Sequence, residues 1–257
     1  MLTSYTLFSG SGGNSFYIGI DGHGILIDCG GSARGICRAL QSIGTSLDRI
    51  DDIFITHEHC DHVSALRVLV KNCGARVHID AKCAENFIDR ATAAMLGDRL
   101  MLSDRDVDFT SGRLKITSFR TPHDAANPRG YVIDTPDGRV GYATDTGCVT
   151  QEMTENLLCC RYAVIEANHD LTMLKYGPYP KSLKARIASD TGHLSNDDSA
   201  RLAFDLYKSG TERIILAHLS RENNTPQIAK RTVASAFSAG DMPYVEAASP
   251  VEVTRLI

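Results

Sequence analysis

An α/β layered fold is the architecture that this sequence predicts, and three observations predict it. Short apolar runs rich in β-branched residues recur along the chain, as is typical of strands. Patterns with helical periodicity lie between them. The 257 residues, 43% of them hydrophobic and 23% charged, are enough to bury a sizeable core. This composition excludes a disordered chain, a collagen-like chain and a coiled coil.

The strand-like runs are, in order, residues 5–8, 15–20, 24–28, 52–56, 76–79, 114–119, 130–134, 139–143, 162–166, 213–217 and 251–256. Helical spacing of apolar residues predicts helices over residues 32–42, 63–72, 82–96, 196–209 and 226–239. The pairs Asp21-Gly22 and Asp137-Gly138 stand between strand-like runs and predict hairpin turns. Thr225 followed by a proline predicts the N-cap and first residue of the last helix. We expect a single domain over residues 1–257.

The charge and the cysteine content of the chain indicate its cellular location and the partners that it is expected to have. The chain has 27 Lys and Arg against 31 Asp and Glu, a net charge of −4, so it has no overall basic footprint for nucleic acid, although a local patch can override the mean. Its eight cysteines form no CxxC pairs, and the N-terminus lacks a basic segment followed by an apolar run. No stretch approaches the ~18 apolar residues of a membrane span. We therefore expect reduced thiols, a cytoplasmic location and no membrane partner.

The segment 56–62, Thr-His-Glu-His-Cys-Asp-His, carries the strongest chemical signal and follows an apolar run directly. In an extended segment His57, His59 and Asp61 point to the same side, and His62 then opens a helix and leaves in another direction. Imidazole and carboxylate together suit Zn²⁺, Mn²⁺ or Fe. A chance cluster at a polar strand end is the weaker interpretation, because three of the nine histidines and an aspartate fall within six residues.

Further candidate ligands occupy the same kind of position elsewhere in the chain. His123, Asp145 and His218 each come just after an apolar, strand-like run. Site residues of layered α/β folds are usually placed at strand ends. Any one of these residues alone would be an ordinary loop residue, but as a set they predict a metal centre.

The order of these motifs resembles that of the metallo-β-lactamase superfamily over essentially the whole chain. The resemblance implies a four-layer αβ/βα sandwich of the metallo-β-lactamase type, with two divalent metal ions in the cleft between the sheets. It assigns Asp28 as an acid that orients ligands rather than binding metal. The ligands that it implies are His57, His59 and His123 for the first ion, Asp61, His62 and His218 for the second, and Asp145 as the bridge.

Several segments narrow the resemblance to the exonuclease-like YycJ/WalJ group, which is related to tRNase Z and to cyclic phosphodiesterases. These are the opening 9–15, Ser-Gly-Ser-Gly-Gly-Asn-Ser, and 218–224, His-Leu-Ser-Arg-Glu-Asn-Asn, together with His-Asp-Ala at His123 and Gly-His-Leu-Ser at 192–195. Secreted β-lactamases of this fold carry cysteine where this chain has Asp145, so antibiotic hydrolysis is disfavoured. The glycine-rich opening precedes another strand-like run and not a helix, which excludes a dinucleotide-binding turn.

Two cations roughly 3.5–4 Å apart can hold a hydroxide and clamp the oxygens of an in-line displacement. A phosphodiester suits such a site, so we expect a metal-dependent hydrolase, an exonuclease-like enzyme that acts on DNA or RNA, with single-stranded DNA favoured.

We place Asp61, Asp28 and His193 in the catalytic machinery, with His193 as the candidate proton donor. The alternative for His193 is a histidine at the start of a helix that is hydrogen-bonded to the backbone. Hydrolysis of a small cyclic phosphodiester, thioester or lactone is the second hypothesis, and structural metals without catalysis the third.

A small basic insert at about 168–195 is the candidate substrate-binding region. Within it, residues 171–187 carry four cations and two tyrosines and no acid. Cations interleaved with aromatic rings suit a phosphate backbone and stacked bases, whereas the alternative is a solvated loop. The candidate substrate-binding residues are Lys175, Tyr176, Lys181 and Lys184, with Arg186 as a further cation and His169 as a possible lid residue or proton donor.

Overall fold

Two seven-stranded mixed sheets with helices packed against them form the architecture in the computed structural model, which describes residues 1–238 and 241–257. This confirms the predicted α/β fold. The chain divides into two compact units. Unit 1 holds residues 1–115, 125–129 and 249–257, and unit 2 holds residues 116–124 and 130–248. The single domain remains a prediction, and each unit is described in turn.

The sheet of unit 1 has the strand order β14-β1-β2-β3-β4-β5-β6. Strands β1 to β3 are antiparallel neighbours, whereas β3 to β6 run parallel. Asp21 and Gly22 adopt positive φ angles of 53° and 85°, which form the predicted hairpin turn between β2 and β3. The strands are β1 (Leu2–Phe8), β2 (Ser15–Ile20), β3 (His23–Ile27), β4 (Ile50–Phe54), β5 (Arg76–Asp80), β6 (Leu100–Ser103) and β14 (Thr254–Arg255).

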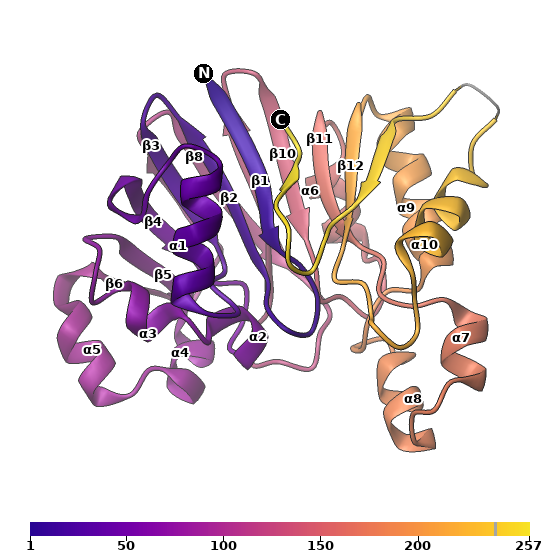
Figure 1. Cartoon of the computed structure of the whole chain (residues 1–257), viewed down its shortest axis with the longest axis horizontal. Coiled ribbons are helices and arrows are strands. Elements are labelled where there is room, and N and C mark those ends of the chain that lie inside the picture. Colours follow the sequence, from indigo (N-terminus) through magenta and orange to yellow (C-terminus); the bar gives the residue numbers. More distant parts are fainter. Residues whose placement is uncertain (239–240) are drawn as a thin grey trace. The chain divides into compact units, whose positions relative to one another are not determined.

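Helix α1 covers the sheet of unit 1 (Figure 1). Its first turn is capped by the Ser32 side chain, which accepts a hydrogen bond from a backbone amide. Ile36 and Leu40 then recur one turn apart on the buried face and join the core that contains Leu26 and Ile53. The helical elements of this unit are α1 (Ala33–Ser42), η1 (Leu47–Arg49), α2 (Cys60–Val63), α3 (Leu66–Leu69), α4 (Ala81–Phe87), α5 (Arg90–Leu96) and η2 (Gly97–Arg99).

The second sheet has the order β13-β12-β11-β10-β9-β8-β7, with parallel pairing from β10 to β13. Leu216 of this sheet shares a core cluster with Leu157, Leu206 and Val233 of three helices. The strands are β7 (Asp108–Ser111), β8 (Leu114–Arg120), β9 (Arg129–Thr135), β10 (Gly138–Ala143), β11 (Tyr162–Glu166), β12 (Arg213–Ala217) and β13 (Tyr244–Ala247). The helices are α6 (Gln151–Leu157), α7 (Leu171–Tyr176), α8 (Lys181–Ile187), α9 (Asn196–Lys208) and α10 (Pro226–Ala234).

Several predicted elements differ from the structure. The helix expected over 82–96 is two helices, because Ile88 is extended and the Asp89 side chain caps a new helix by accepting from Thr92 N. The helix expected over 63–72 is also two short helices, α2 and α3. The strand expected over 251–256 is confined to β14, and β6, β7, β13 and α6 lack a sequence prediction. Helix α10 ends at Ala234, and Ala239, the last residue expected in it, lies outside the described residues.

Two findings bear on the expected setting. Along the described residues, no helix combines the length and the apolar character that a membrane crossing requires. The structure describes all eight cysteines, and each is a free thiol.

A buried ionic network in unit 1 lies away from the candidate ligands, in the body of strands β4 and β5. The fully buried Asp52 carboxylate accepts hydrogen bonds from Arg76 Nε (2.7 Å) and Nη2 (2.8 Å), from Ser111 Oγ (2.5 Å), and is paired with His78 Nε2 (2.8 Å). Burial alone would raise the pKa of Asp52, but the hydrogen bonds from His78, Arg76 and Ser111 outweigh it and lower this pKa. The ionised carboxylate therefore stabilises the folded state.

We expect Asp52→Asn to lower the free energy of unfolding by about 1–3 kcal/mol at pH 7, because the Arg76 guanidinium loses its charged partner and one of the two acceptor oxygens. The folded-state pKa lies below the unfolded value of about 3.9, so this contribution is present above pH ~4 and is lost as the pH falls through the folded pKa. Denaturant titrations should show a gap between wild type and variant that narrows below pH ~4. The control is Asp51→Asn, whose exposed pairing with His23 should be worth less than about 0.5 kcal/mol. A gap that is constant down to pH 3 would contradict the assignment.

Candidate metal centre

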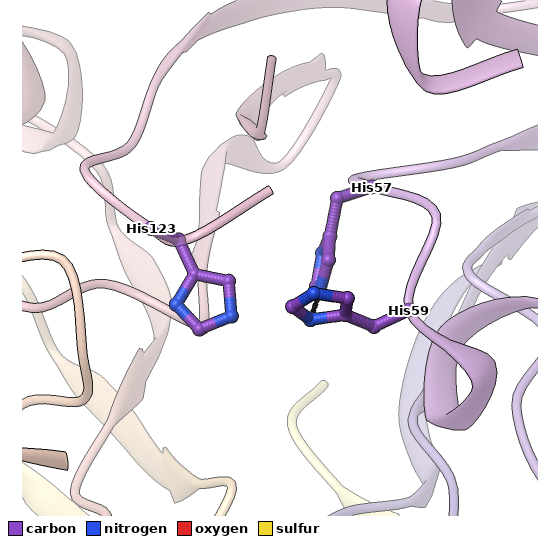
Figure 2. A group of neighbouring side chains, drawn as sticks. All are labelled: His57, His59 and His123. Atoms are coloured by element: carbon purple, nitrogen blue, oxygen red, sulfur yellow. Dashed lines mark hydrogen bonds between the residues drawn. The ribbon is translucent and has the colours of Figure 1, made fainter. Parts of the chain in front are cut away.

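The first set of candidate ligands lies in unit 1, in the segment that follows β4. The His57 side chain is fully buried, and its Nε2 lies 3.0 Å from His59 Nδ1, with the two rings nearly perpendicular. Figure 2 shows these two rings and the hydrogen bond between them, and also draws His123, which unit 2 supplies. Two ring nitrogens turned toward each other in this way can ligate one cation.

Asp61 and His62 form the second pair in unit 1. The extended conformation expected through Asp61 is wrong: α2 begins at Cys60, two residues earlier than expected, so Asp61 lies in the first helical turn. Asp61 Oδ2 lies 3.5 Å from His62 Nε2. Asn14 Nδ2 lies between them, 3.1 Å from the carboxylate and 3.0 Å from the ring nitrogen. Asn14 is a site residue that the sequence analysis misses.

The glycine-rich opening explains why Asn14 reaches this pair. This segment is a tight connection between the antiparallel strands β1 and β2. Asn14 N donates to Asp61 O (2.8 Å), and Gly30 N donates to Asn14 O (2.8 Å). A Cβ at Gly30 would lie 1.7 Å from Asp61 O, so only glycine allows the backbone to pack against the ligand segment.

Asp28 orients this half of the site without needing to bind metal. Its fully buried carboxylate accepts from Thr56 N and Thr56 Oγ1, both at 2.8 Å, and lies 2.7 Å from His62 Nδ1. Burial raises the pKa of Asp28, while His62 and Thr56 oppose that rise. Because the Nδ1 side of His62 is held by Asp28, its Nε2 is directed toward Asp61.

Unit 2 supplies a compact set of donors from three strand ends and from the segment between α8 and α9. Asp145, Glu166, His193 and His218 each offer a ligand atom, and these atoms lie within 4.8 Å of one another. His218 Nδ1 is 3.0 Å from Asp145 Oδ2. Asp145 and His218 both adopt left-handed backbone conformations, with φ of 55° and 54°, just after β10 and β12. Such turns at strand ends redirect the side chains into the cluster, at a cost in strain that is typical of functional sites.

His123 follows β8 and faces the same cluster. Its Nδ1 donates to Gly192 O at 2.9 Å, which leaves Nε2 directed toward Asp145 Oδ1 at 3.8 Å. Burial lowers the pKa of His123, which favours the neutral ring that a metal requires. The sequence-predicted residues of unit 2 are therefore brought together as expected.

Glu166, the last residue of β11, is the most important residue that the sequence analysis misses. Its buried carboxylate accepts from Thr146 N at 2.7 Å and Leu194 N at 3.3 Å through one oxygen. The other oxygen lies 2.7 Å from His193 Nδ1. The signal was present, because Glu166 ends an apolar strand in the manner of the other site residues.

The ring of His193 is therefore hydrogen-bonded to the Glu166 carboxylate. The alternative, a histidine at the start of a helix that is hydrogen-bonded to the backbone, does not describe it. Burial alone would lower the pKa of His193, but the charge and hydrogen bond of Glu166, assisted by Asp145, raise it to about 9. At neutral pH this imidazole carries a proton that it can donate to a departing oxygen.

His169 is buried in unit 2 as well, in the segment after β11. Its side chain is 2% exposed, and among the described residues its Nδ1 has no hydrogen-bond partner. Burial lowers the pKa of His169, so this ring is neutral. Two histidines thus accompany the donor set: His169 is neutral and His193 is positively charged.

The basic insert folds as two short helices, α7 and α8, and is not a loop (Figure 1). Lys184 Nζ donates to Lys175 O (2.8 Å) and Gly177 O (2.7 Å), so this ammonium joins the two helices. Lys175 Nζ lies 5.2 Å from the centre of the Tyr176 ring, which is 75% exposed. Lys175, Tyr176 and Lys181 face solvent, whereas Lys184 has a structural role.

The donor chemistry fits divalent metal ions. The side chains are imidazoles and carboxylates, most of them buried, and neighbouring donor atoms in each unit are 3.0–3.8 Å apart. Ligands bound tetrahedrally at about 2.0–2.1 Å from zinc are separated by about 3.3 Å. Within each unit, neighbouring donors therefore lie at spacings suited to ligating one cation.

Comparison with known proteins agrees with this geometry. A model of the beta-lactamase superfamily domain matches residues 23–219. The chain belongs to the beta-lactamase superfamily. It is 32% identical over 256 residues to exodeoxyribonuclease YycJ of Bacillus anthracis, covering 97% of this chain and 96% of that protein. It is 34% identical over 237 residues to exodeoxyribonuclease WalJ of Streptococcus pneumoniae, covering 92% and 88%.

Solved structures of the superfamily share the fold. The metallo-β-lactamase fold protein YhfI from Bacillus subtilis superimposes with a TM-score of 0.70, covering 99% of both chains at 15% identity. Human tRNase Z, short form, superimposes with a TM-score of 0.68, covering 99% of both chains at 16% identity. The expected metallo-β-lactamase fold is thereby confirmed, and with the relatives above the chain is a metal-dependent hydrolase.

Proposed function

We propose that this protein is an exonuclease-like phosphodiesterase that acts on DNA, with single-stranded DNA as its preferred substrate. The observation that carries the proposal is the pairing of His193 with Glu166 beside Asp145. The departing oxygen of a nucleotide is strongly basic and needs a proton, whereas the thiolate released from a thioester does not. A histidine held protonated at neutral pH therefore favours a phosphodiester over a thioester.

The proposed metal ligands combine donors of both units. We assign His57, His59 and His123 to one ion, Asp61, His62 and His218 to the other, and Asp145 to both, with Zn²⁺, Mn²⁺ or Fe as the metal. When bound, the two ions supply Lewis acidity and a nucleophile at neutral pH. Asp28 holds His62 in its ligating orientation, and the Gly192 carbonyl does the same for His123.

Within this arrangement the remaining side chains have distinct tasks. His193 binds a non-bridging oxygen of the scissile phosphate and transfers its proton to the departing oxygen. Glu166 keeps that proton on His193 and fixes the ring by accepting from Nδ1. His169 is neutral and is a weaker candidate for the proton donor. The names of the two relatives, both exodeoxyribonucleases of bacteria, support DNA as the polymer.

The central experiment assays the purified protein on single-stranded DNA, a small cyclic phosphodiester and an acyl-thioester. We expect hydrolysis of DNA that is abolished by chelation, and a loss of about 100-fold or more in Asp145→Ala, since a carboxylate shared by two cations is removed. Asp134→Ala is the control, because Asp134 is a half-exposed partner of Arg139 at the end of β9. Preferential hydrolysis of the thioester would overturn the proposal.

A second test concerns His193. The variant His193→Ala should lose about 10²–10⁴-fold in kcat on DNA, the usual contribution of a proton donor. The loss should be much smaller on bis-p-nitrophenyl phosphate, because its leaving group needs no proton, and the metal content should not change. Equal losses on both substrates would reject His193 as the proton donor.

A third test concerns the exposed cations of the α7–α8 insert. We expect the double variant Lys175→Glu and Lys181→Glu to bind a single-stranded oligonucleotide more weakly and with a flatter salt dependence, by about 0.7 units of slope per lost phosphate contact. The matched control reverses Lys71 and Lys208, which are exposed on other elements and carry the same charge change. Lys184 is left intact, because its loss would disrupt the insert itself. Similar binding by both double variants would mean that the insert is a solvated surface.

A further inference from the structure

We propose that Arg186 forms a phosphate subsite next to the metal centre and binds a non-scissile phosphate of the polynucleotide. This inference rests on the proposed nuclease function and names a contact within it. The subsite would make hydrolysis depend on the non-bridging oxygens of one particular phosphate, adjacent to the bond that is cut.

The guanidinium of Arg186 is held in one orientation, but most of its N–H donors remain available for a ligand. Its Nε donates to Asp124 Oδ2 at 2.5 Å, and this is the single hydrogen bond of its side chain among the described residues. The side chain is 56% exposed. A guanidinium has five N–H donors, so its two terminal amines keep four of them for a ligand. An arginine fixed through Nε presents these donors as a planar fork, which matches two oxygens of a phosphate.

Asp124 places this fork beside the proposed ligands of unit 2. Its other oxygen, Oδ1, lies 3.4 Å from His123 Nε2. The ring of His123 in turn lies 5.0 Å from the ring of His193, centre to centre. Arg186 is thus connected through Asp124 to a proposed metal ligand that neighbours the proposed proton donor.

The backbone keeps Arg186 in a fixed relation to His193. Arg186 is in the last turn of α8, and His193 N donates to Ile187 O at 2.9 Å. A Cβ on Gly192 would lie 2.2 Å from Arg186 O, so the turn between α8 and His193 is tightly packed and has no room for a side chain at this position. A phosphate bound at Arg186 would therefore have a defined distance from the phosphate bound at His193.

Lys184 and Lys175 of the insert do not offer such a site. The Lys184 ammonium donates hydrogen bonds to two backbone carbonyl oxygens. The Lys175 ammonium lies over the exposed ring of Tyr176. An exposed ion pair such as Arg186–Asp124 contributes only about 0–1 kcal/mol to stability, so stability is a weak reason for its geometry. Asp124 offsets the charge of Arg186, and selection at this subsite therefore comes from paired hydrogen bonds rather than from net charge.

The experiment combines protein variants with single methylphosphonate replacements along a single-stranded oligonucleotide, each of which removes the charge of one phosphate. The full-length wild type is compared with Arg186→Gln, with Arg186→Lys, which keeps the charge but not the fork, and with Arg201→Gln. Arg201 is the matched control, because its Nη1 donates at 2.7 Å to Asp198 on the surface of α9. We would measure kcat/KM of the metal-loaded protein, and also Kd by fluorescence anisotropy with chelator present so that no cleavage occurs.

We expect one replacement, next to the scissile linkage, to weaken wild-type binding by about 10–100-fold, the value of a charge-assisted pair of hydrogen bonds. In both Arg186 variants that replacement should cost less than about 3-fold, while Arg201→Gln should keep the wild-type pattern. The same position-specific loss in the Arg186 variants as in wild type would overturn the subsite. If the wild type neither binds nor cleaves DNA, the proposed function itself fails, and this outcome is distinct from normal DNA cleavage without coupling at Arg186.

Discussion

One fully buried carboxylate in each unit holds the rest of the candidate site in place. Asp28 in unit 1 joins Thr56 and His62, and Glu166 in unit 2 joins Thr146, Leu194 and His193. A buried charge is tolerated only when donors surround it, so each carboxylate forces two or three separate segments into one arrangement. The ligand segments are therefore ordered by the fold, and metal binding meets side chains that are already oriented.

The two carboxylates differ in what they do to histidine. Asp28 holds the Nδ1 side of His62, which turns Nε2 toward Asp61 as a ligand. Glu166 instead raises the pKa of His193 to about 9 and keeps it protonated. The same kind of contact thus suits one imidazole to the proposed role of cation ligand and the other to the proposed role of proton donor. Such a division suits a phosphodiester, which needs both metal ions and an acid.

In the proposed function, the insert of α7 and α8 would connect substrate binding to this centre. Lys184 ties the two helices together, and the turn after α8 supplies the Gly192 carbonyl that orients His123. Exposed groups on the insert, namely Lys175, Tyr176 and Lys181, are free to meet a strand of nucleic acid, whereas Arg186 is held close to the proposed metal ligands. Contacts to distant and to adjacent phosphates would therefore be made by different parts of one small element.

The fold class, the superfamily and the positions of the ligand candidates can all be predicted from the amino-acid sequence. These features are local: apolar runs mark strands, and polar residues at the ends of those runs, such as His57, His123 and Asp145, are site residues in layered α/β folds. The early start of α2 at Cys60 and the break before Asp89 were missed, because capping and tertiary packing decide helix ends within a few residues.

Which of these side chains contact one another becomes visible only in the folded chain. Glu166 and His193 are 27 residues apart, and Asp28 and Thr56 are 28 apart, so no periodicity links them. The distinction between Lys184 and Lys181 likewise depends on where α8 lies against α7. Hydrogen bonds between distant segments form only once the chain is folded, and they set the charge of His193 and the role of each cation in the insert. Residue types and spacing alone do not contain that information.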